Sequence, residues 1–392
     1  MAVASDRRAD KYPIQRLLEH ARKAPDKIWL VQPAGDSVRQ WTWSQAAREI
    51  GRMAAALKAQ DWPEGSAIAI SGRNTAHWFM ADLAIQWAGH VTVGLYPKQA
   101  ASATTYILEH CEARAVFLGP MPDGAEFLAA IPEGVRTIRF PYVEAPHGDI
   151  DWDAMAQAES PLSSYERPAP DALMTLIYTS GTTGHPKGVM MTYGGMAWTA
   201  QAFLSKLPPA QADEKLFSYL PLAHLLERAA VETASLLWRA EVHFLEALDK
   251  LAQQLPQVAP TRFFAVPLVW GRFKAGILGK LSEDKLDRLM SIPLLRNVVR
   301  YKLLKTLGLQ NVRMALSGAA MLIIEATAVE RTGRITPGCL GLYNDASEAA
   351  LKQILTSVRK HSHTAIAMQL AHAGRKASSA RPWRASRGSQ SS

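Results

Sequence analysis

The sequence predicts an α/β fold in which largely parallel sheets are flanked by helices. Strand-like and helix-like segments alternate along most of the 392 residues, which is the pattern of βαβ units. The hydrophobic fraction of 48% and the charged fraction of 20% are those of ordinary globular proteins, so two or three packed domains fit this length. The two cysteines, Cys111 and Cys339, are too few for a disulfide framework.

The first half of the chain begins with a helix, two short strands and a second helix. Ile14, Leu17 and Ala21 fall on one helical face that ends before Pro25. Ser44 is the expected N-cap of a helix that runs to about residue 59. We also expect strands at 28–31, 39–43, 67–70 and 91–95, a helix at 76–87, and irregular connection and edge structure at 119–171.

The second half continues the alternation on both sides of a glycine-rich loop. After Pro382 the sequence is rich in Ser, Arg and Gly, which predicts a disordered tail. A last βαβ unit is expected from strands at 321–329 and 364–370 around a helix at 346–361. The other expected strands are 172–178, 216–220, 241–245, 262–266 and 312–316, and the expected helices are 195–207, 225–237 and 248–257.

The net charge of +9 is concentrated at the C-terminal end. Residues 351–392 contain eight basic and no acidic residues, so subtracting these eight leaves +1 for residues 1–350. A nearly neutral body argues against nucleic-acid binding. The N-terminus lacks the apolar core of a secretory signal, and Asp82, Gln86 and His90 interrupt the longest apolar stretch, which argues against a transmembrane helix. We therefore expect a cytoplasmic protein.

The segment from Tyr178 to Val189 is a candidate phosphate-binding loop. Its glycines let backbone N–H groups approach a polyphosphate, its hydroxyls donate hydrogen bonds to the oxygens, and Lys187 supplies a positive charge. Gly188 follows Lys187, so the spacing is not that of a Walker loop. The alternative is a surface turn with one solvated lysine. The candidate nucleotide contacts are Thr179, Ser180, Gly181, Thr182, Thr183, Gly184 and Lys187.

This loop resembles, in nearly every position, the signature loop of the adenylate-forming superfamily, which includes acyl-CoA synthetases, luciferases and peptide-synthetase adenylation domains. Further segments are similar to the N-terminal half of long-chain fatty acid–CoA ligases, and the resemblance covers about residues 10–319. It implies a truncated N-terminal domain of the adenylate-forming fold. The similar segments are Trp41–Ser44, Gly72–Trp78, Ala81–Pro97, Ser218–Arg228 and Arg313–Ala320.

The resemblance implies a two-step ligase reaction. The carboxylate of a fatty acid attacks the α-phosphate of ATP, giving an acyl-adenylate and pyrophosphate, and the thiol of coenzyme A then displaces AMP. Lys187, the loop amides and Mg²⁺ would neutralise the charge of the polyanion. The family's histidine beside the acyl pocket corresponds to His224, and its adenine-packing turn to Gly318 and Ala319. The alternatives are a helix-start histidine satisfied by backbone and an ordinary strand-ending turn.

The resemblance to the ligases stops at Ala320. Beyond it the sequence lacks the family's Tyr-Gly-x-Thr-Glu motif, whose Glu holds Mg²⁺, the ribose-binding Asp, and the C-terminal domain with its adenylation lysine. We therefore expect a truncated ligase in which full acyl-CoA synthesis is absent. No residue of this chain is a candidate metal ligand.

The C-terminal segment resembles a different family, the Old Yellow Enzyme-type NAD(P)H:flavin oxidoreductases, which are flavin-bound TIM barrels. The resemblance implies that Gln369 would hydrogen-bond the flavin ring, with Ala326 or Ala328 near it. Two strands of eight cannot close a barrel, so FMN binding is not expected, and a βαβ fragment that binds nothing is the favoured interpretation. The similar segments are 321–329, 333–338 and 369–377.

The expected domains are a ligase-like segment at 1–319, a partial oxidoreductase-like segment at 320–383 and a tail at 384–392. A fusion of two truncated genes at about 318–321, in the organism or through sequence assembly, would explain the join. Three functions stay open: an impaired ligase that takes a fatty acid, ATP and CoA, a non-catalytic remnant, and a fragment of an FMN-dependent oxidoreductase. Such ligases often contact membranes, so a peripheral contact at the inner face of the membrane also stays open.

Overall fold

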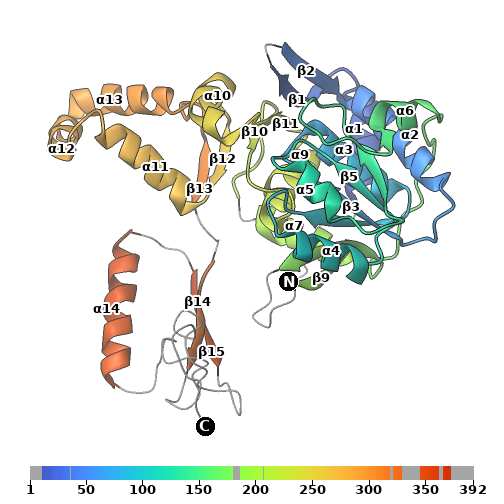
Figure 1. The fold of residues 1–392 in the computed structure, drawn as a ribbon. Helices are drawn as coiled ribbons and strands as arrows, with labels where there is room; N and C mark the ends of the chain where they lie inside the picture. The colour runs from blue at the N-terminus through green and yellow to red at the C-terminus, as the bar shows by residue number, and fades with distance from the viewer. Residues whose placement is uncertain are drawn as a thin grey trace, which may run out of the picture. The chain divides into compact units, whose positions relative to one another are not determined.

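The computed structural model describes residues 11–35, 37–179, 186–205, 207–317, 321–328, 345–361 and 365–371. The chain divides into two compact units. The first comprises Met1–Ala265 and Gly271–Leu316, and the second comprises Val266–Trp270 and Ser317–Ser392. Both large sheets belong to the first unit (Figure 1).

A seven-stranded sheet forms the centre of the first unit. Its order is β7-β6-β5-β3-β4-β8-β9, and neighbouring strands are parallel except for the last pair, β8 and β9. Parallel neighbours need crossover connections, and helices supply most of them. The predicted α/β fold with a parallel-rich sheet is confirmed. The strands are β3 (Ala67–Ser71), β4 (Val91–Leu95), β5 (Ala115–Leu118), β6 (Arg136–Arg139), β7 (Ile150–Asp151), β8 (Leu173–Thr179) and β9 (Lys187–Thr192).

A second sheet has four strands in the order β10-β11-β1-β2. The first three strands are parallel, and β2 is antiparallel to β1. A further pair is formed by β12 and β13. The bounds are β1 (Ile28–Ala34), β2 (Ser37–Thr42), β10 (Lys215–Ser218), β11 (Glu241–Phe244), β12 (Arg262–Ala265) and β13 (Met314–Ser317).

Helix α3 (Ala76–Trp87) packs against both sheets. It contacts β1 of the four-stranded sheet and β3 and β4 of the seven-stranded sheet, and all of its residues are buried. A helix covered on every side has no polar face, which explains its apolar sequence. The helices around these sheets are α1 (Pro13–Lys23), α2 (Trp43–Lys58), α4 (Ala101–His110), α5 (Gly124–Ala129), α6 (Trp152–Gln157), α7 (Tyr193–Leu204), α8 (Leu225–Glu227), α9 (Ala234–Trp238) and α10 (Leu251–Val258).

The N-cap of α2 is Thr42, so the prediction of Ser44 is wrong. The Thr42 hydroxyl accepts a hydrogen bond from the Gln45 N–H at 3.3 Å, and the Gln45 side chain accepts one from the Thr42 N–H at 2.9 Å. The helix begins two residues earlier than expected because Trp43 is fully buried in its first turn, stacked on Trp29. This reciprocal pair is a capping box.

Several elements were not foreseen. Residues 119–171, expected as irregular and edge structure, do supply the outer strands β6 and β7, but they also contain α5 and α6. The interior strand β5 and helix α4 were missed, and so was β9, which contains the last three residues of the glycine-rich segment, Lys187 to Val189. The helix expected at 225–237 is α8 and α9 joined by a π-helical turn, Arg228–Thr233. A 3-10 turn at Leu248–Lys250 precedes α10.

Three further helices lie between β12 and β13, where the sequence analysis predicted no element. They are α11 (Pro267–Leu278), α12 (Glu283–Ser291) and α13 (Pro293–Thr306). None of the described side chains from 271 to 306 is buried. Figure 1 shows the three helices in orange tones, away from both large sheets.

The second unit contains one βαβ element, as predicted. Strands β14 (Met321–Ala328) and β15 (Ala365–Ala371) are parallel, with Met321 opposite Ala365, and α14 (Asp345–His361) lies between them in sequence. This arrangement is common to many α/β folds, so the resemblance to a TIM-barrel oxidoreductase stays a prediction. Among the described residues of the whole chain, no helix is long and apolar enough to cross a bilayer.

Candidate functional site

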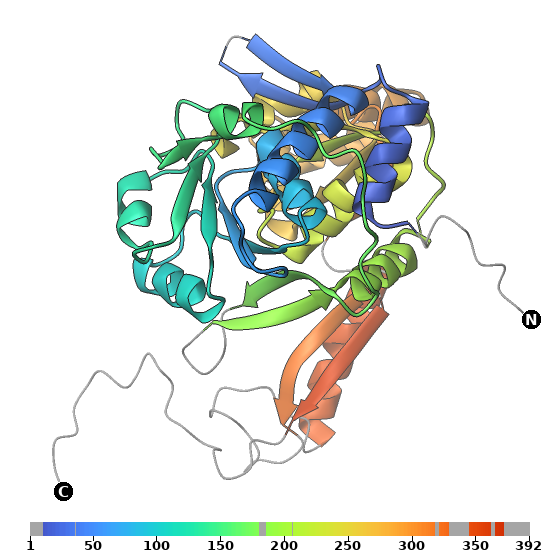
Figure 2. The same ribbon diagram turned by 90° about the vertical axis from the view of Figure 1, so that its right-hand side faces the viewer.

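The glycine-rich segment connects two antiparallel strands at one end of the seven-stranded sheet. Thr179 is the last residue of β8, Lys187 is the first of β9, and the two are paired across the strands (Figure 2, green). Both side chains are exposed. The predicted contacts Ser180, Gly181, Thr182, Thr183 and Gly184 lie outside the described residues. The structure therefore describes the two strand ends that flank the loop, and Lys187 is the first residue of the second strand, β9.

Tyr178 anchors the start of this loop. Its hydroxyl lies 2.7 Å from Nδ1 of His110 on α4, and burial raises the pKa of the phenol above its ordinary value. A Cβ on Gly188 would lie 3.1 Å from the Tyr178 ring, so glycine lets the two strands approach there. The hydroxyl of Tyr178 is thus paired with His110 inside the fold. The candidate nucleotide contacts among the hydroxyl residues of the loop follow Tyr178 in sequence.

His224 is the N-cap of α8 and is exposed. Its Nδ1 accepts a hydrogen bond from the Leu226 N–H at 3.1 Å. This is the backbone-satisfied helix start that the sequence left open as an alternative. A neutral imidazole that accepts at Nδ1 carries its proton on Nε2, so the ring retains one donor for a ligand.

A close contact brings the segment that precedes α8, which we call the His224 loop, to the same edge of the seven-stranded sheet as the glycine-rich segment that carries Lys187. Gly94 on β4 has no side chain, and a Cβ there would lie 2.9 Å from the Cα of Ala223. Gly94 is opposite Ile177 on β8, two residues before Thr179. Ala223 and the adjoining His224 therefore lie close to the point where β8 leads into the glycine-rich segment. Carboxyl ends of parallel strands are the usual location of ligand sites in such sheets.

A buried hydrogen-bond network holds the His224 loop in place. Glu227 accepts hydrogen bonds from the Ser218 hydroxyl at 2.8 Å and from the Tyr219 N–H at 3.0 Å. The Asn74 amide donates to Ser218 at 2.9 Å and to the Leu220 carbonyl at 2.6 Å. Burial raises the pKa of Glu227 to about 8, although its hydrogen bonds act in the opposite direction. The sequence analysis missed this network.

A buried ion cluster fixes the π-helical turn to β8 and α3. Arg228 donates to both carboxylate oxygens of Asp82 at 2.7 Å and to the Thr175 hydroxyl at 2.7 Å. Glu232 lies 3.6 Å from the Arg228 guanidinium, and burial beside Asp82 raises its pKa well above the ordinary value. One arginine faces two carboxyl groups, so we interpret Glu232 as protonated. The sequence signal for this ion cluster was Asp82, a charged residue within the largely apolar stretch that forms α3.

A large cavity lies beside these elements. Its volume is about 1000 Å³, which is at the upper end of the range for small-molecule sites. Leu225, the residue after His224, packs on four apolar residues that also line the cavity. Met174 and Tyr193 lie at the amino end of β8, where Leu173 is paired with Thr192, so the cavity lies toward the opposite end of this strand from Thr179 and Lys187. The four shared residues are Tyr12, Met174, Tyr193 and Met196.

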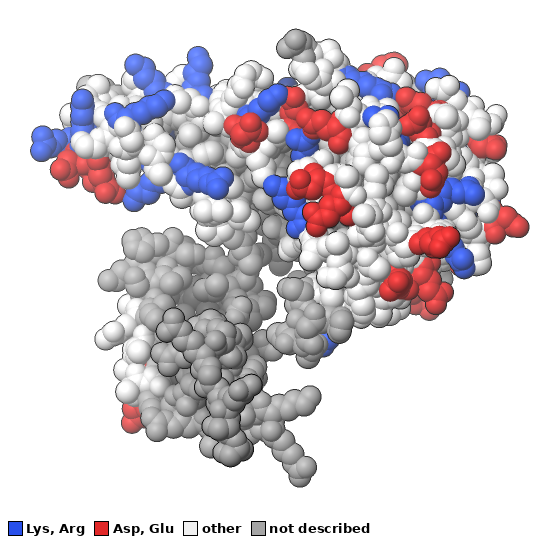
Figure 3. Space-filling model, viewed as in Figure 1, with Lys and Arg blue, Asp and Glu red and all other residues white. Residues whose placement is uncertain are grey.

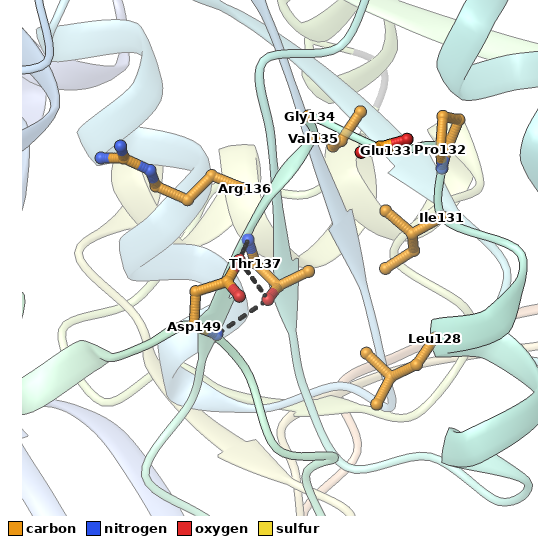
Figure 4. Close-up of a pocket in the computed structure, with 9 residues that line it drawn as sticks. All are labelled: Leu128, Ile131, Pro132, Glu133, Gly134, Val135, Arg136, Thr137 and Asp149. Atoms are coloured by element: carbon orange, nitrogen blue, oxygen red, sulfur yellow. Dashed lines mark hydrogen bonds between the residues drawn. The ribbon is translucent and has the colours of Figure 1, made fainter.

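Another pocket, of about 400 Å³, opens at the opposite edge of the sheet (Figure 4). The Asp149 carboxylate accepts hydrogen bonds from the Thr137 N–H and hydroxyl at 2.8 and 2.9 Å, so its polar groups are paired with each other. Thr137 lies near the amino end of β6, away from the carboxyl ends that carry Thr179. This pocket has no catalytic group and is not a candidate for the functional site.

The remaining predicted site residues cannot be assessed as contacts. Gly318 and Ala319 lie outside the described residues. Gln369 is on β15 and Ala326 and Ala328 are on β14, where only the backbone is described. Among the described residues, no group of three or more His, Cys, Asp or Glu side chains could hold a metal ion.

The chain is similar to known proteins over most of its length. The family described as AMP-binding enzyme matches residues 17–343. A long-chain-fatty-acid–CoA ligase of Xenopus laevis, ACSBG2, is 28% identical over 277 residues, covering 66% of this chain and 38% of the relative. The peroxisomal long chain acyl-CoA synthetase 6 of Arabidopsis thaliana is 27% identical over 342 residues, covering 76% and 47%. The chain thus spans less than half the length of these relatives.

Solved structures show the same fold. The adenylation domain of a carboxylate reductase from Mycobacterium chelonae has a TM-score of 0.66 at 19% identity, covering 92% of this chain and 58% of that one. The N-terminal domain of FACL13 from Mycobacterium tuberculosis has a TM-score of 0.60 at 19% identity, covering 79% and 70%. At these identities the likeness concerns the fold alone.

Proposed function

We propose that this chain, which belongs to the AMP-binding enzyme family, uses ATP to activate the carboxylate of a long-chain fatty acid. The main support is the convergence of two features at one sheet edge, the lysine-bearing β8–β9 segment and the His224 loop, together with a large cavity lined by residues at the other end of β8. The relatives named above as fatty acid ligases favour this substrate class. The product of the first step would be an acyl-adenylate with release of pyrophosphate.

In this proposal Lys187 is the charge that receives the nucleotide. It is exposed and lies on a strand, and no carboxylate of the described residues forms an ion pair with it, so its ammonium group can approach phosphate. Thr179 and the loop residues 180–184 would add hydroxyl and backbone donors to the same phosphates. Concentrated positive charge lowers the repulsion between the attacking carboxylate and the polyphosphate, which is the electrostatic part of the catalysis.

The acyl substrate would enter the cavity with its carboxylate toward His224. The Nε2 proton of His224 is available to hydrogen-bond a carboxylate oxygen, since Nδ1 is occupied by the Leu226 N–H. The alkyl chain would extend along β8 to the cavity, whose lining combines apolar side chains with Lys11, Arg16 and Arg239 and whose volume of about 1000 Å³ has room for it. His224 thus orients the nucleophile and does not need to remove a proton from it.

Mg²⁺ would arrive with ATP, because the described residues do not gather a set of ligands for it. We assign no step to the ion. Gly318 and Ala319 are proposed to pack on the adenine. Coenzyme A is the acceptor of the second step in the family reaction, and we propose that this step is impaired in this chain. We place the protein in the cytoplasm, with a peripheral contact to the inner face of a membrane.

The test is the formation of AMP and pyrophosphate from ATP by the purified full chain with hexadecanoate, with and without coenzyme A. Activity that depends on the fatty acid supports the proposal. ATP binding without fatty acid-dependent turnover would favour the non-catalytic alternative, and a yellow protein with bound flavin would favour the oxidoreductase fragment. His224→Ala should raise the KM for hexadecanoate more than the KM for ATP, whereas a His243→Ala control should change neither.

A further inference from the structure

A small polar chamber lies beside the large cavity, near the amino end of β8. Its volume is about 10 Å³, which is enough for one water-sized group. The chamber and the cavity share five lining residues, so the two spaces adjoin each other. Two of these residues are methionines, whose side chains adapt readily to a neighbouring group. The shared residues are Pro13, Met174, Met196, Thr233 and Leu236.

The chamber is lined by buried polar atoms that lack a hydrogen bond. Gln86 is 1% exposed and Glu232 3%, and no donor of the described residues reaches Oε1 of either side chain. Nε of Arg228 is also without an acceptor at hydrogen-bond distance among the described residues, since Oε2 of Glu232 is 3.6 Å away. Unpaired polar atoms are costly in a protein interior. Two acceptors and one donor therefore line a space that holds one small group.

The other polar atoms of these side chains are paired, which fixes the lining. The Gln86 amide donates to Asp82 at 2.9 Å, and Arg228 donates to both carboxylate oxygens of Asp82 at 2.7 Å. Only the nitrogen of the amide can donate to a carboxylate, so the free atom of Gln86 is its oxygen. Figure 3 shows charged side chains spread over one face of the first unit, whereas those of the chamber are buried.

A hydroxyl group matches this set of atoms. It can donate a hydrogen bond to Gln86 or Glu232 and accept one from Arg228. A methyl group would leave all three atoms unpaired, and an ammonium group would be repelled by Arg228. A carboxylate has no proton to donate to Gln86 and exceeds the size of the chamber. Both the size and the hydrogen-bonding atoms of the chamber therefore favour a hydroxyl.

The position of the chamber indicates where on an acyl chain this hydroxyl would be. Met174, which lines the chamber, is five residues from Thr179 on β8, about 17 Å along the strand. An acyl carboxylate held at His224 lies near the Thr179 end. Only the far end of an extended long chain would therefore reach the chamber, and a plain alkyl end would leave its polar atoms unpaired.

We propose that the protein selects long-chain fatty acids that carry a hydroxyl group at the end opposite the carboxylate, through hydrogen bonds to Gln86 and Glu232. This deepens the proposed function by naming the substrate class, and it rests on that function for the placement of the carboxylate. Affinity is measured without turnover. A chain that binds such acids preferentially but forms no AMP would therefore contradict the proposed function and leave the selection supported.

The experiment is displacement of a fluorescent fatty acid, cis-parinaric acid, from the full chain by three unlabelled acids. They are hexadecanoate, 16-hydroxyhexadecanoate and, as a matched control, 2-hydroxyhexadecanoate, whose hydroxyl lies beside the carboxylate. The wild type should bind 16-hydroxyhexadecanoate roughly three- to tenfold more tightly than either of the others, which is the effect of one net hydrogen bond in a buried site. This comparison of acids requires no variant.

Gln86→Met tests the residue, because methionine keeps the length of the side chain without the acceptor. The variant should bind hexadecanoate and 16-hydroxyhexadecanoate with nearly equal affinity. The control Gln60→Met, which changes a partly buried glutamine that does not line the chamber, should keep the preference of the wild type. Circular dichroism melting checks that both variants are folded.

Equal affinity of the wild type for hexadecanoate and 16-hydroxyhexadecanoate would overturn the proposal and mean that the chamber holds a water molecule only. Equal affinity for the two hydroxy acids, or an unchanged preference in folded Gln86→Met, would also overturn it. If none of the fatty acids binds, both this selection and the fatty acid as substrate are wrong.

Discussion

Helices α3 and α13 have similar lengths but opposite surroundings. Every residue of α3 is buried between two sheets, whereas no described side chain of α13 is buried. Trp78 and Leu83 on α3 are each 1% exposed, and Leu295 on α13 is 42% exposed. The compositions match these surroundings, because nine of the 12 residues of α3 are apolar, whereas α13 has seven apolar and four basic residues among 14. The composition of each helix therefore indicates whether it fills the core that positions the site or stays in contact with water.

The largest expected difference between these regions concerns buried charge. Arg228→Met should lower the unfolding free energy by about 3–5 kcal/mol, because it leaves Asp82 of α3 buried without its bidentate partner. Arg296→Met on α13 should change it by less than about 0.5 kcal/mol. Urea unfolding monitored by the fluorescence of the buried tryptophans checks both. The double variant Asp82→Leu/Arg228→Met should recover part of the loss, and equal effects of the two single variants would contradict the contrast.

Core truncation tests the comparison with a matched pair of leucines. Leu83→Ala should cost about 2–5 kcal/mol, because the packed core between the sheets cannot fully collapse into the cavity. Leu295→Ala should cost less than about 0.5 kcal/mol, because water already reaches that side chain. The same denaturation assay compares them. A cost above about 2 kcal/mol at Leu295 would mean that α13 is covered in solution, by another part of the chain or by a second copy.

The buried network beneath His224 should make stability depend on pH. Burial raises the pKa of Glu227 to about 8 from an ordinary 4.5, so the folded state keeps a proton that the unfolded chain releases between these values. The contribution of Glu227 to the unfolding free energy should therefore be fully present below about pH 4.5 and be lost as pH rises toward 8. Glu232, raised in the same direction, adds to this slope.

Glu227→Gln separates the contribution of Glu227, because glutamine keeps the shape without the titration. Between pH 5 and 8 its unfolding free energy should lose less with rising pH than that of the wild type, while Glu232 and the buried histidines His20, His77 and His90 contribute the same slope in both proteins. The surface variant Glu64→Gln should keep the wild-type slope. If the unfolding free energy of Glu227→Gln depends on pH as steeply as that of the wild type, Glu227 is ionised in the folded state and the account of the network is wrong.

The smallest expected effects are at the helix starts. Thr42→Ala should cost about 1 kcal/mol, because it removes the capping box of α2. Helix α13 has Ile292 at its N-cap without a side-chain hydrogen bond, so Ile292→Ser should leave stability unchanged or raise it by up to about 1 kcal/mol. Thermal unfolding by circular dichroism resolves both. A loss at Ile292→Ser would show that the isoleucine side chain is buried by a partner in solution.

The body of the fold was predictable because its elements carry clear periodicity. Helix α3 and strand β4 have the expected bounds, Ala76–Trp87 and Val91–Leu95, since an apolar run between turn residues leaves few alternatives. Strand β5 was missed because four residues, Ala115–Leu118, give no measurable period. Helices α11 and α13 were missed because neither has a single apolar face to reveal a helix, whereas α12 has one and was overlooked. Ser44 was preferred over Thr42 because sequence alone does not show that Trp43 is already in the first turn.

The candidate site residues came from motifs, whereas the network that supports them was missed. Lys187, Thr179 and His224 were proposed because their residue types and spacing match a phosphate loop and a family motif, and their roles stay predictions. Glu227 and Asn74 were not proposed, because their role depends on contacts between positions 153 residues apart in sequence, which only the fold brings together. The cavity was likewise invisible, since it is lined from α1, α7, α9 and the chain that follows α7.

The central claim is that the end of β8 and the start of β9 receive the phosphates of ATP. Titration of the full chain with a fluorescent ATP analogue tests it most directly, with Lys187→Ala and the exposed control Lys58→Ala measured in parallel. Removing a charged phosphate contact should weaken binding by roughly ten- to a hundredfold for Lys187→Ala, while Lys58→Ala matches the wild type. Equal affinity in all three proteins would contradict the assignment of this site.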